Sequence, residues 1–501
     1  MAKPMETIAK GEHYRKKGGR LMEDADEVVL MHKPGIPEDY RYLLTAFHLI
    51  DKSHLIMLAE EKLIPRQDAV TMLKAFKDME RGGVEEVRLR TGGAMHSGEH
   101  YLIEKLGEEI GGRLHLGQSS GDMQSTSGRL LVRTGYLELM EEVLNFRAGL
   151  LEMARQHVET VMPHYTRYQH GQTTTLGHYL VAVIRALERD FERLAQAFVR
   201  CNVSSMGCGA GTGSEFALNR ERTAELMGFA AVNTNAKDCY AYLDFGVEAF
   251  TIMSVLMTNI ERLATDIFIW YTYEFGLVDI ADRYCGTSSI MAQKKNPHGL
   301  MYVTENISKL IGRMTGALAQ YRNISGIGVL KELGATFQLT KRALHALAGI
   351  TTTLDIKTAR MRQLSTAFWA QASDLAGAIV TEKGLPWRTA YQIVAILVRQ
   401  SIDEGKGEKD VTPEMVDRAA IEYTGKPVGL SAEAIRKALD PLECVKARNL
   451  VGGPAPEQVK KQIEESEQTL ARDKKIFGEF QGQIESGENK IEEAERALLG
   501  T

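Results

Sequence analysis

Apolar residues recur along most of the chain at intervals of three and four, the spacing of one face of an α-helix. Strict alternation of apolar and polar positions, which favours β-strands, is nearly absent. The helical pattern is longest over residues 130–160, 175–201, 244–275 and 298–322. Each stretch far exceeds the average globular helix of about 11–12 residues. The pattern therefore predicts an all-α protein.

The long predicted helices are apolar around much of their circumference. Helices of that kind are buried on more than one side, as in a long central helix bundle. Such a bundle has more apolar surface than one chain can cover. We therefore also expect the protein to form oligomers.

Glycine and proline breaks divide the chain into three predicted helical domains, residues 1–118, 119–366 and 367–501. The middle domain carries the long helices. The last stretch, residues 457–499, is rich in charge and has apolar residues at helical intervals, which predicts one or two amphipathic helices. A solvated tail fits its composition equally well. Polar, glycine-rich loops are predicted within the middle domain at residues 117–128, 163–174, 203–215 and 284–299.

Composition excludes several classes of protein. The net charge of −5 and the lack of a basic cluster interleaved with aromatic residues argue against nucleic-acid binding. The first residues lack an apolar signal core, and no apolar run reaches the roughly 20 residues that span a bilayer. We therefore expect a cytoplasmic protein that does not enter membranes.

The five cysteines are scattered and show no Cys-x-x-Cys spacing, so neither a disulfide framework nor a zinc module is predicted. Cys285 borders one of the loops, but no activating partner can be named, so we interpret it as a small loop residue. The thirteen histidines are spread out, and no His-x-x-x-His pair is interpreted as a metal site. We expect no metal site.

The first candidate loop contains Ser119, Ser120 and Gly121. Its hydroxyls and the backbone N–H groups at the start of the following helix are suited to binding an anion. A simple Ser/Asp helix cap explains the same residues equally well.

The second candidate loop holds Thr166, Arg167 and Gln172, which are able to grip carboxylates. His164 and His170 are able to move protons near neutral pH. For each histidine, a structural role is the commoner alternative.

The third candidate loop carries Ser288, followed by Lys294 and Asn296 at alternate positions. A lysine and an amide so placed hold a carboxylate through charge and hydrogen bonds, and a serine beside such cations is able to act as a base. Ser289 and Met291 are further candidate substrate contacts. These residues predict an anion-binding loop without naming a reaction.

The stretch from Ser288 to Pro297, SSIMAQKKNP, resembles the signature SSIMPQKKNP of the aspartase/fumarase superfamily, with Ala292 in place of proline. The resemblance is closest to the argininosuccinate lyase branch and covers almost the whole chain. Other stretches carry the same resemblance, among them Gly177–Leu180, Asn219–Phe229, Leu385–Ala390 and Val451–Pro456.

The resemblance implies three helical domains, a homotetramer with a central helical core, and active sites shared between subunits. It also implies β-elimination of fumarate from a small di- or tricarboxylate substrate, with no metal and no organic cofactor. Ser288 would be the base, while Lys294 and Asn296 would stabilise the aci-carboxylate intermediate. Thr166 matches the family's hydroxyl position, and His96 and Glu99 match a family stretch that lines the site.

This sequence departs from the branch around the leaving group. In that branch the second loop reads Thr-His-Leu-Gln, and its histidine is linked to protonation of the leaving nitrogen. In this sequence the position of that histidine is occupied by Arg167. The glutamate that pairs with this histidine corresponds to Met301. The first loop, Gly-Arg-Ser-Arg-Asn-Asp in the branch, has lost two arginines and an asparagine. Arginine is no ordinary proton donor, but it binds a carboxylate bidentately.

Three functions fit these residues. The first is a carbon–nitrogen lyase that acts on an N-substituted aspartate other than argininosuccinate. The second is argininosuccinate lyase itself, with His170 or water as the acid. The third is a folded but inactive homologue that serves as a structural protein. Retention of Ser288, Lys294 and Asn296 favours an enzyme.

Overall fold

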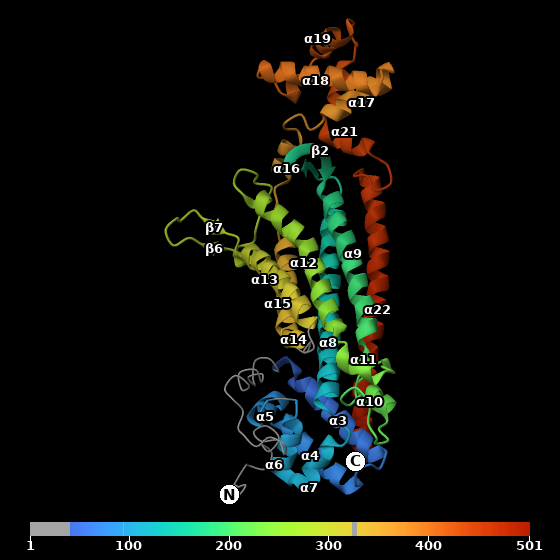
Figure 1. Cartoon of the computed structure of the whole chain (residues 1–501). Coiled ribbons are helices and arrows are strands. Elements are labelled where there is room, and N and C mark those ends of the chain that lie inside the picture. Colours follow the sequence, from blue (N-terminus) through green and yellow to red (C-terminus); the bar gives the residue numbers. More distant parts are fainter. Residues whose placement is uncertain (1–40, 94, 323–327, 501) are drawn as a thin grey trace.

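The computed structural model describes residues 41–93, 95–322 and 328–500, and the described chain is predominantly helical. Figure 1 shows an elongated molecule with a small helical group at each end of a long bundle. The prediction of an all-α fold is confirmed. Strand pairing among the described residues is limited to four two-stranded ladders.

The long bundle explains the sustained apolar pattern. Phe146, Phe191 and Phe250, from three different helices, belong to its core and are almost completely buried. The four predicted long stretches are confirmed as helices α8, α9, α12 and α13. The bundle helices are α8 (Ser120–Gln156), α9 (Leu176–Cys201), α12 (Asp244–Tyr271), α13 (His298–Tyr321), α15 (Leu333–Thr351) and α22 (Pro456–Leu499).

Shorter helices make up the two ends and the connections. At one end are η1 (Arg41–Leu43), α3 (Leu44–Glu60), α4 (Arg66–Arg81), α5 (Val84–Arg90), α6 (Ser97–Leu106), α7 (Glu108–Gly111) and η2 (Gly112–His115). At the other are α16 (Thr358–Ser365), α17 (Ala372–Lys383), α18 (Trp387–Asp403), η4 (Glu408–Asp410), α19 (Pro413–Thr424), α20 (Ala432–Ala438) and α21 (Pro441–Ala447). The connections hold α10 (Arg220–Leu226), α11 (Ala236–Ala241), η3 (Asp282–Tyr284) and α14 (Gly328–Lys331).

The strands lie in the connections between helices. They are the antiparallel pair β1 (Val161–Thr166) and β2 (Gln169–Thr175), the parallel pair β3 (Val203–Ser204) and β4 (Ala231–Val232), and the antiparallel pairs β5 (Val278–Asp279) with β8 (Asp355–Ile356) and β6 (Gly286–Thr287) with β7 (Lys295–Asn296).

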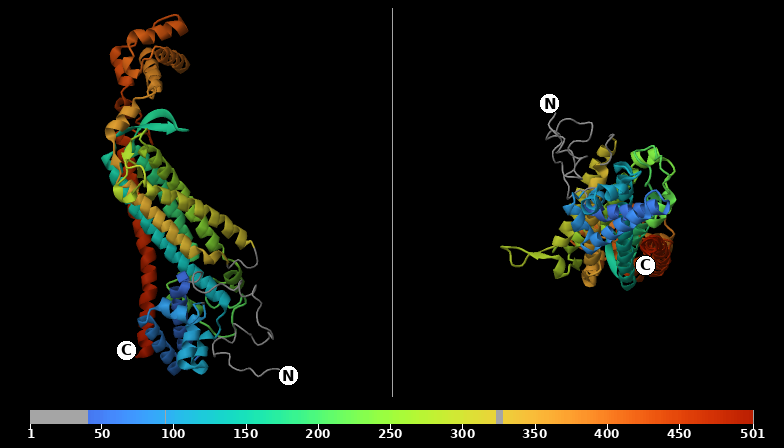
Figure 2. Two further views of the ribbon diagram at one scale, coloured as in Figure 1. Left: turned by 90° about the vertical axis from the view of Figure 1, so that its left-hand side faces the viewer. Right: turned by 90° about the horizontal axis from the view of Figure 1, so that it is seen from below.

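Residues 457–499 lie within one helix, α22, which runs back along the bundle to the N-terminal helices (Figure 2). Val459 and Ile463 belong to the bundle core, whereas Ile491 and Leu498 belong to the core of the N-terminal helices. The side chain of Arg147 in α8 donates to Asp473 in α22 at 2.7 Å, and both side chains are buried. The tail is therefore a packed helix. The domain boundaries after residues 118 and 366 stay a prediction.

Two of the predicted loops are regular structure. Residues 120–128 belong to α8, because Ser119 caps the helix one residue earlier and lets it start there. Residues 163–174 form most of the β1–β2 hairpin, whose Thr-rich strands lack the apolar alternation that reveals a strand in sequence.

Candidate active site

The first candidate loop is the N-terminus of α8. Ser119 acts as its cap: its hydroxyl accepts from the Gly121 N–H at 3.3 Å, and its own N–H donates to Asp122 Oδ1 at 2.9 Å. Burial raises the pKa of Asp122 to about 6 against the opposing effect of backbone N–H groups. A Cβ on Gly121 would overlap the Tyr240 ring. The Ser119 hydroxyl thus caps the helix and Gly121 allows the close approach of Tyr240, whereas Ser120 is the exposed residue at this helix start.

Ser120 connects this loop to His96, whose Nε2 lies 3.0 Å from the Ser120 hydroxyl. His96 is buried beside Glu99 and His115. The hydrogen bond to Glu99, which outweighs burial, raises the pKa of His115. Burial opposes ionisation of Glu99, yet the bond to His115 lowers its pKa. His115 was not selected from the sequence, because no local spacing links it to His96.

The second candidate loop is the tip of the β1–β2 hairpin. Thr166 pairs with Gln169, so Arg167 and Tyr168 alone make the turn, and all four are exposed. Gln172, farther along β2, donates to the Ser373 hydroxyl at 2.9 Å. This contact attaches the hairpin to α17.

His170 lies at the base of this turn. Its Nε2 is 3.4 Å from the Tyr165 hydroxyl, and its ring packs edge-on against Tyr165 and near Phe368. Burial lowers the pKa of His170, so its neutral form dominates at pH 7. A neutral imidazole has a proton to exchange but no charge to bind a carboxylate.

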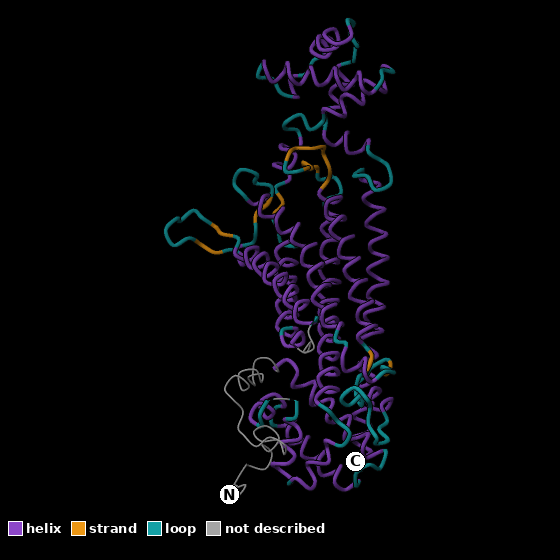
Figure 3. The backbone as a smooth tube through the Cα atoms, in the orientation of Figure 1, coloured by secondary structure: helices purple, strands orange, loops and turns teal. Residues whose placement is uncertain are grey.

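The third candidate loop is a hairpin that projects from the side of the bundle between β6 and β7 (Figure 3). The Ser288 hydroxyl oxygen accepts from the backbone N–H groups of Ile290 and Met291 at 3.3 and 3.1 Å. Such donors stabilise negative charge that develops on an oxygen. The loop geometry is thus suited to a serine that gives up its proton.

The two lysines of this loop differ in what they contact. Lys295 donates to Asp279 at 3.1 Å and also pairs with Asp282 at 2.8 Å, so it holds the hairpin to the body of the protein. Lys294 is exposed, and the structure as described gives its ammonium no ion pair. Lys294 is therefore available to an anion, and half-buried Asn296 lies two residues farther on, in β7.

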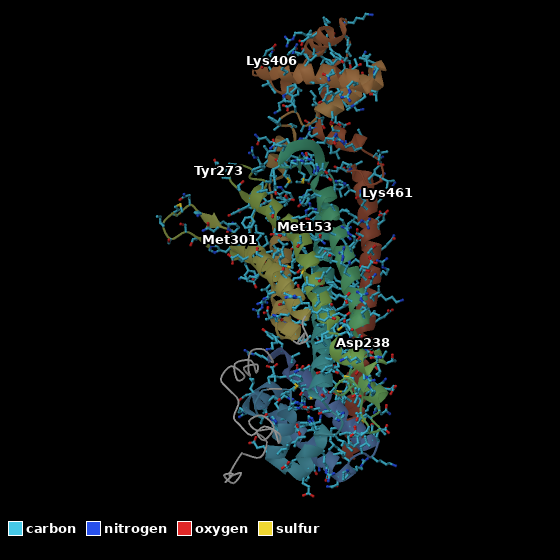
Figure 4. All side chains as sticks on the ribbon, viewed as in Figure 1. Met153, Asp238, Tyr273, Met301, Lys406 and Lys461 are labelled. Atoms are coloured by element: carbon cyan, nitrogen blue, oxygen red, sulfur yellow. The ribbon has the colours of Figure 1, made fainter. Side chains whose placement is uncertain are left out.

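The three loops lie far apart within one chain (Figures 1 and 2). The first is at the beginning of α8 and the second follows its end, and a helix of 37 residues is about 55 Å long. The third extends from the side, near Met301 on α13 (Figure 4). A single chain therefore does not bring the predicted site residues together.

The turn of the second loop is strained. Arg167 and Tyr168 have φ angles of 53° and 59°, in the left-handed region where hairpins normally place Asn and Gly. This region costs a residue with a side chain about 1–2 kcal/mol. Strain of this kind clusters at functional sites, where the surrounding structure holds it in place.

Replacing Tyr168 by glycine is therefore expected to stabilise the protein by about 1 kcal/mol, because glycine adopts this conformation without strain. Thermal unfolding measures the change. Tyr168→Ala is the matched control: it removes the same exposed ring and keeps the strain, so it should not stabilise. Equal effects of the two variants would contradict a strained turn.

Comparison with family models places the chain among known enzymes. A family described as Lyase matches residues 52–316, and one described as Argininosuccinate lyase C-terminal matches residues 369–446. The argininosuccinate lyase of Methanocaldococcus jannaschii is 35% identical over 483 residues, which cover 95% of this chain and 97% of that protein. Argininosuccinate lyase 1 of Shouchella clausii is 30% identical and covers 94% of this chain and 97% of its own length.

Comparison with solved structures also finds similar lyases. An EDDS lyase in complex with formate has a TM-score of 0.87 at 27% identity, over 92% of this chain and 93% of that one. An EDDS lyase variant with bound fumarate has a TM-score of 0.86 at 26% identity, over 94% of this chain and 97% of that one. Among the described helices, none is long and apolar enough to cross a membrane. The chain belongs to the lyase family of the aspartase/fumarase superfamily, in its argininosuccinate lyase-like branch, and is a fumarate-releasing carbon–nitrogen lyase.

Proposed function

We propose that this enzyme eliminates an amine from an N-substituted aspartate other than argininosuccinate. The observation that carries the proposal is the Ser288 loop, in which two backbone N–H groups donate to the serine oxygen beside an available Lys294. Changes around Ser120 and Arg167 alter the residues that would meet the leaving group. A solved neighbour is named EDDS lyase, which fits a leaving group other than arginine.

In the proposed reaction, Ser288 first gives up its own proton, and its oxygen then removes a proton from the carbon next to the substrate carboxylate. Lys294 and Asn296 hold that carboxylate and stabilise the dianionic aci-carboxylate, where concentrated positive charge has its largest effect. The electron pair then forms the double bond of fumarate, the carbon–nitrogen bond breaks, and the amine takes up a proton. Addition of the amine to fumarate is the same path in reverse.

We propose that Ser119, Ser120, Gly121, His96, Thr166, Gln172, Ser289 and Met291 line the substrate. We further propose a cytoplasmic homotetramer in which several chains complete each site. The separation of the three loops within one chain supports a shared site, because one copy alone leaves each loop without the others.

A panel of N-succinyl amino acids and amines, with argininosuccinate and EDDS included, tests the proposal. Release of fumarate is followed by its absorbance. Turnover of an N-succinyl compound faster than argininosuccinate is the expected result. Fast cleavage of argininosuccinate with no turnover of the others would overturn it.

Argininosuccinate lyase proper is the second candidate, favoured by the names of relatives at 35% identity. His170, half-buried in the same hairpin as Arg167, or water would then donate the proton to the leaving nitrogen. Growth of an arginine auxotroph that carries this chain is expected only under this alternative.

Arg167 is proposed to bind an additional carboxylate of the substrate. Arg167→Met should raise KM by about tenfold to a hundredfold, the equivalent of about 1.5–3 kcal/mol for a hydrogen bond to a charged group. Arg167→Lys retains the charge without bidentate geometry and should have an intermediate KM. Steady-state kinetics on the best substrate of the panel measures both. An unchanged KM for Arg167→Met would make this residue structural.

A further inference from the structure

Two histidines and a glutamate from separate parts of the N-terminal helices converge on one place. His96 precedes α6, Glu99 is in its first turn, and His115 ends η2. One ligand atom from each side chain lies within 4.8 Å of the other two. His115 Nδ1 is 3.1 Å from Glu99 Oε2, and His96 Nδ1 is 3.9 Å from the same oxygen.

These separations approach those of a metal centre. Zinc–ligand bonds of about 2.0–2.1 Å in a tetrahedral site place neighbouring donor atoms roughly 3.3 Å apart. The His115–Glu99 pair is already at that distance, whereas the donor atoms of His96 and His115 lie within 4.8 Å of each other, so an ion would have to draw His96 closer to both partners. Two imidazoles and one carboxylate are a donor set that zinc and its neighbours in the transition series bind.

The surroundings also fit a cation. His96 is buried, and its Nε2 lies against the Ser120 hydroxyl at 3.0 Å. With its proton on Nε2, His96 donates to Ser120 and leaves Nδ1 directed toward Glu99. A bond of this kind at the second ring nitrogen orients metal-binding histidines in known sites.

Access from solvent favours the same conclusion. The His115 side chain is 40% exposed, whereas Glu99 is 18% exposed, so an ion has a route from solvent. Three protein ligands leave a fourth position open to water or to an anion.

We propose that His96, Glu99 and His115 form a binding site for a divalent transition metal of the zinc class, with Ser120 as the hydrogen-bond partner that orients His96. The site goes beyond the proposed lyase function, with which it shares His96 and Ser120, and metal binding is measured without turnover. It adjoins the start of α8, so an ion there adds positive charge beside Ser120.

Binding of Co²⁺ to the full-length protein, stripped of metal with a chelator and dialysed, tests the proposal. Calorimetry is expected to show one ion per chain, and the visible absorption of Co²⁺ is expected to intensify as it does in low-coordinate sites. Glu99→Gln and His115→Gln should each weaken binding by at least tenfold, and Ser120→Ala by about tenfold. Circular dichroism confirms that each variant is folded.

His345→Gln is the matched control. His345 Nδ1 also lies 3.1 Å from a carboxylate, that of Glu142, but in the described part of the chain this pair has no third ligand. This variant should bind Co²⁺ like the wild type. Equal affinity of the wild type, Glu99→Gln and His115→Gln, or the absence of saturable binding to the wild type, would overturn the proposal.

Discussion

Replacing Ser288 by alanine is expected to lower kcat by about 10²–10⁴-fold, the usual contribution of a general base. The substitution removes the oxygen that accepts from the N–H groups of Ile290 and Met291, and with it the proposed proton acceptor. The loop is exposed, so the fold and the oligomer should persist. Fumarate absorbance measures the rate, and size-exclusion chromatography the assembly.

Ser289→Ala is the comparison for this experiment. Ser289 is the adjacent serine, exposed, and proposed to contact substrate rather than remove a proton. Its loss should alter KM and leave kcat within about tenfold, because only the base takes part in the proton-transfer step. If Ser288→Ala kept its rate within about tenfold of the wild type, another group would be the base.

Replacing Arg147 by methionine is expected to destabilise the protein by about 3–5 kcal/mol, the cost of removing one partner from a buried ion pair. The Arg147 side chain is fully buried between α8, α9 and α22. It donates to Asp473 at 2.7 Å and lies 3.8 Å from Glu188. Without the guanidinium, Asp473 keeps a buried charge without its main partner. The midpoint of denaturant unfolding measures the effect.

Two comparisons test the physical reason. Arg155 in α8 pairs with Glu467 in α22, but their side chains are 49% and 36% exposed. Arg155→Met should therefore lower the free energy of unfolding by less than about 1 kcal/mol. The double variant Arg147→Met with Asp473→Leu removes both buried charges and should recover most of the loss. Equal costs for Arg147→Met and Arg155→Met would contradict this account.

The pattern of apolar residues was sufficient to predict the architecture of the bundle. Residues 175–201 were predicted as a helix, and α9 spans Leu176–Cys201. The agreement is close because a helix buried on several sides needs apolar residues at every turn, which is a local and long signal. The β1–β2 hairpin was missed, since its strands are rich in polar residues and leave no comparable signal.

The candidate site was predictable only as separate pieces. Ser288, Lys294 and Asn296 stand within nine residues, so one stretch of sequence is enough to recognise them. The fold of the hairpin decides which lysine is able to bind an anion: Lys295 forms ion pairs with Asp279 and Asp282, which leaves Lys294 for the substrate. Likewise, the sequence predicted a Ser/Asp cap at this helix start, and the backbone conformation assigned the cap to Ser119.

By itself, the sequence determined that the chain is helical, which stretches form the bundle, and which loop carries the serine. These properties follow from residues close together along the chain. The tertiary structure alone decided that α22 returns to pack against α8 and α9, and that the three candidate loops lie far apart in one copy. It also brought His115 to within 3.1 Å of Glu99, sixteen positions earlier in the chain. Such contacts depend on how helices pack in space, and no local spacing of residues encodes that.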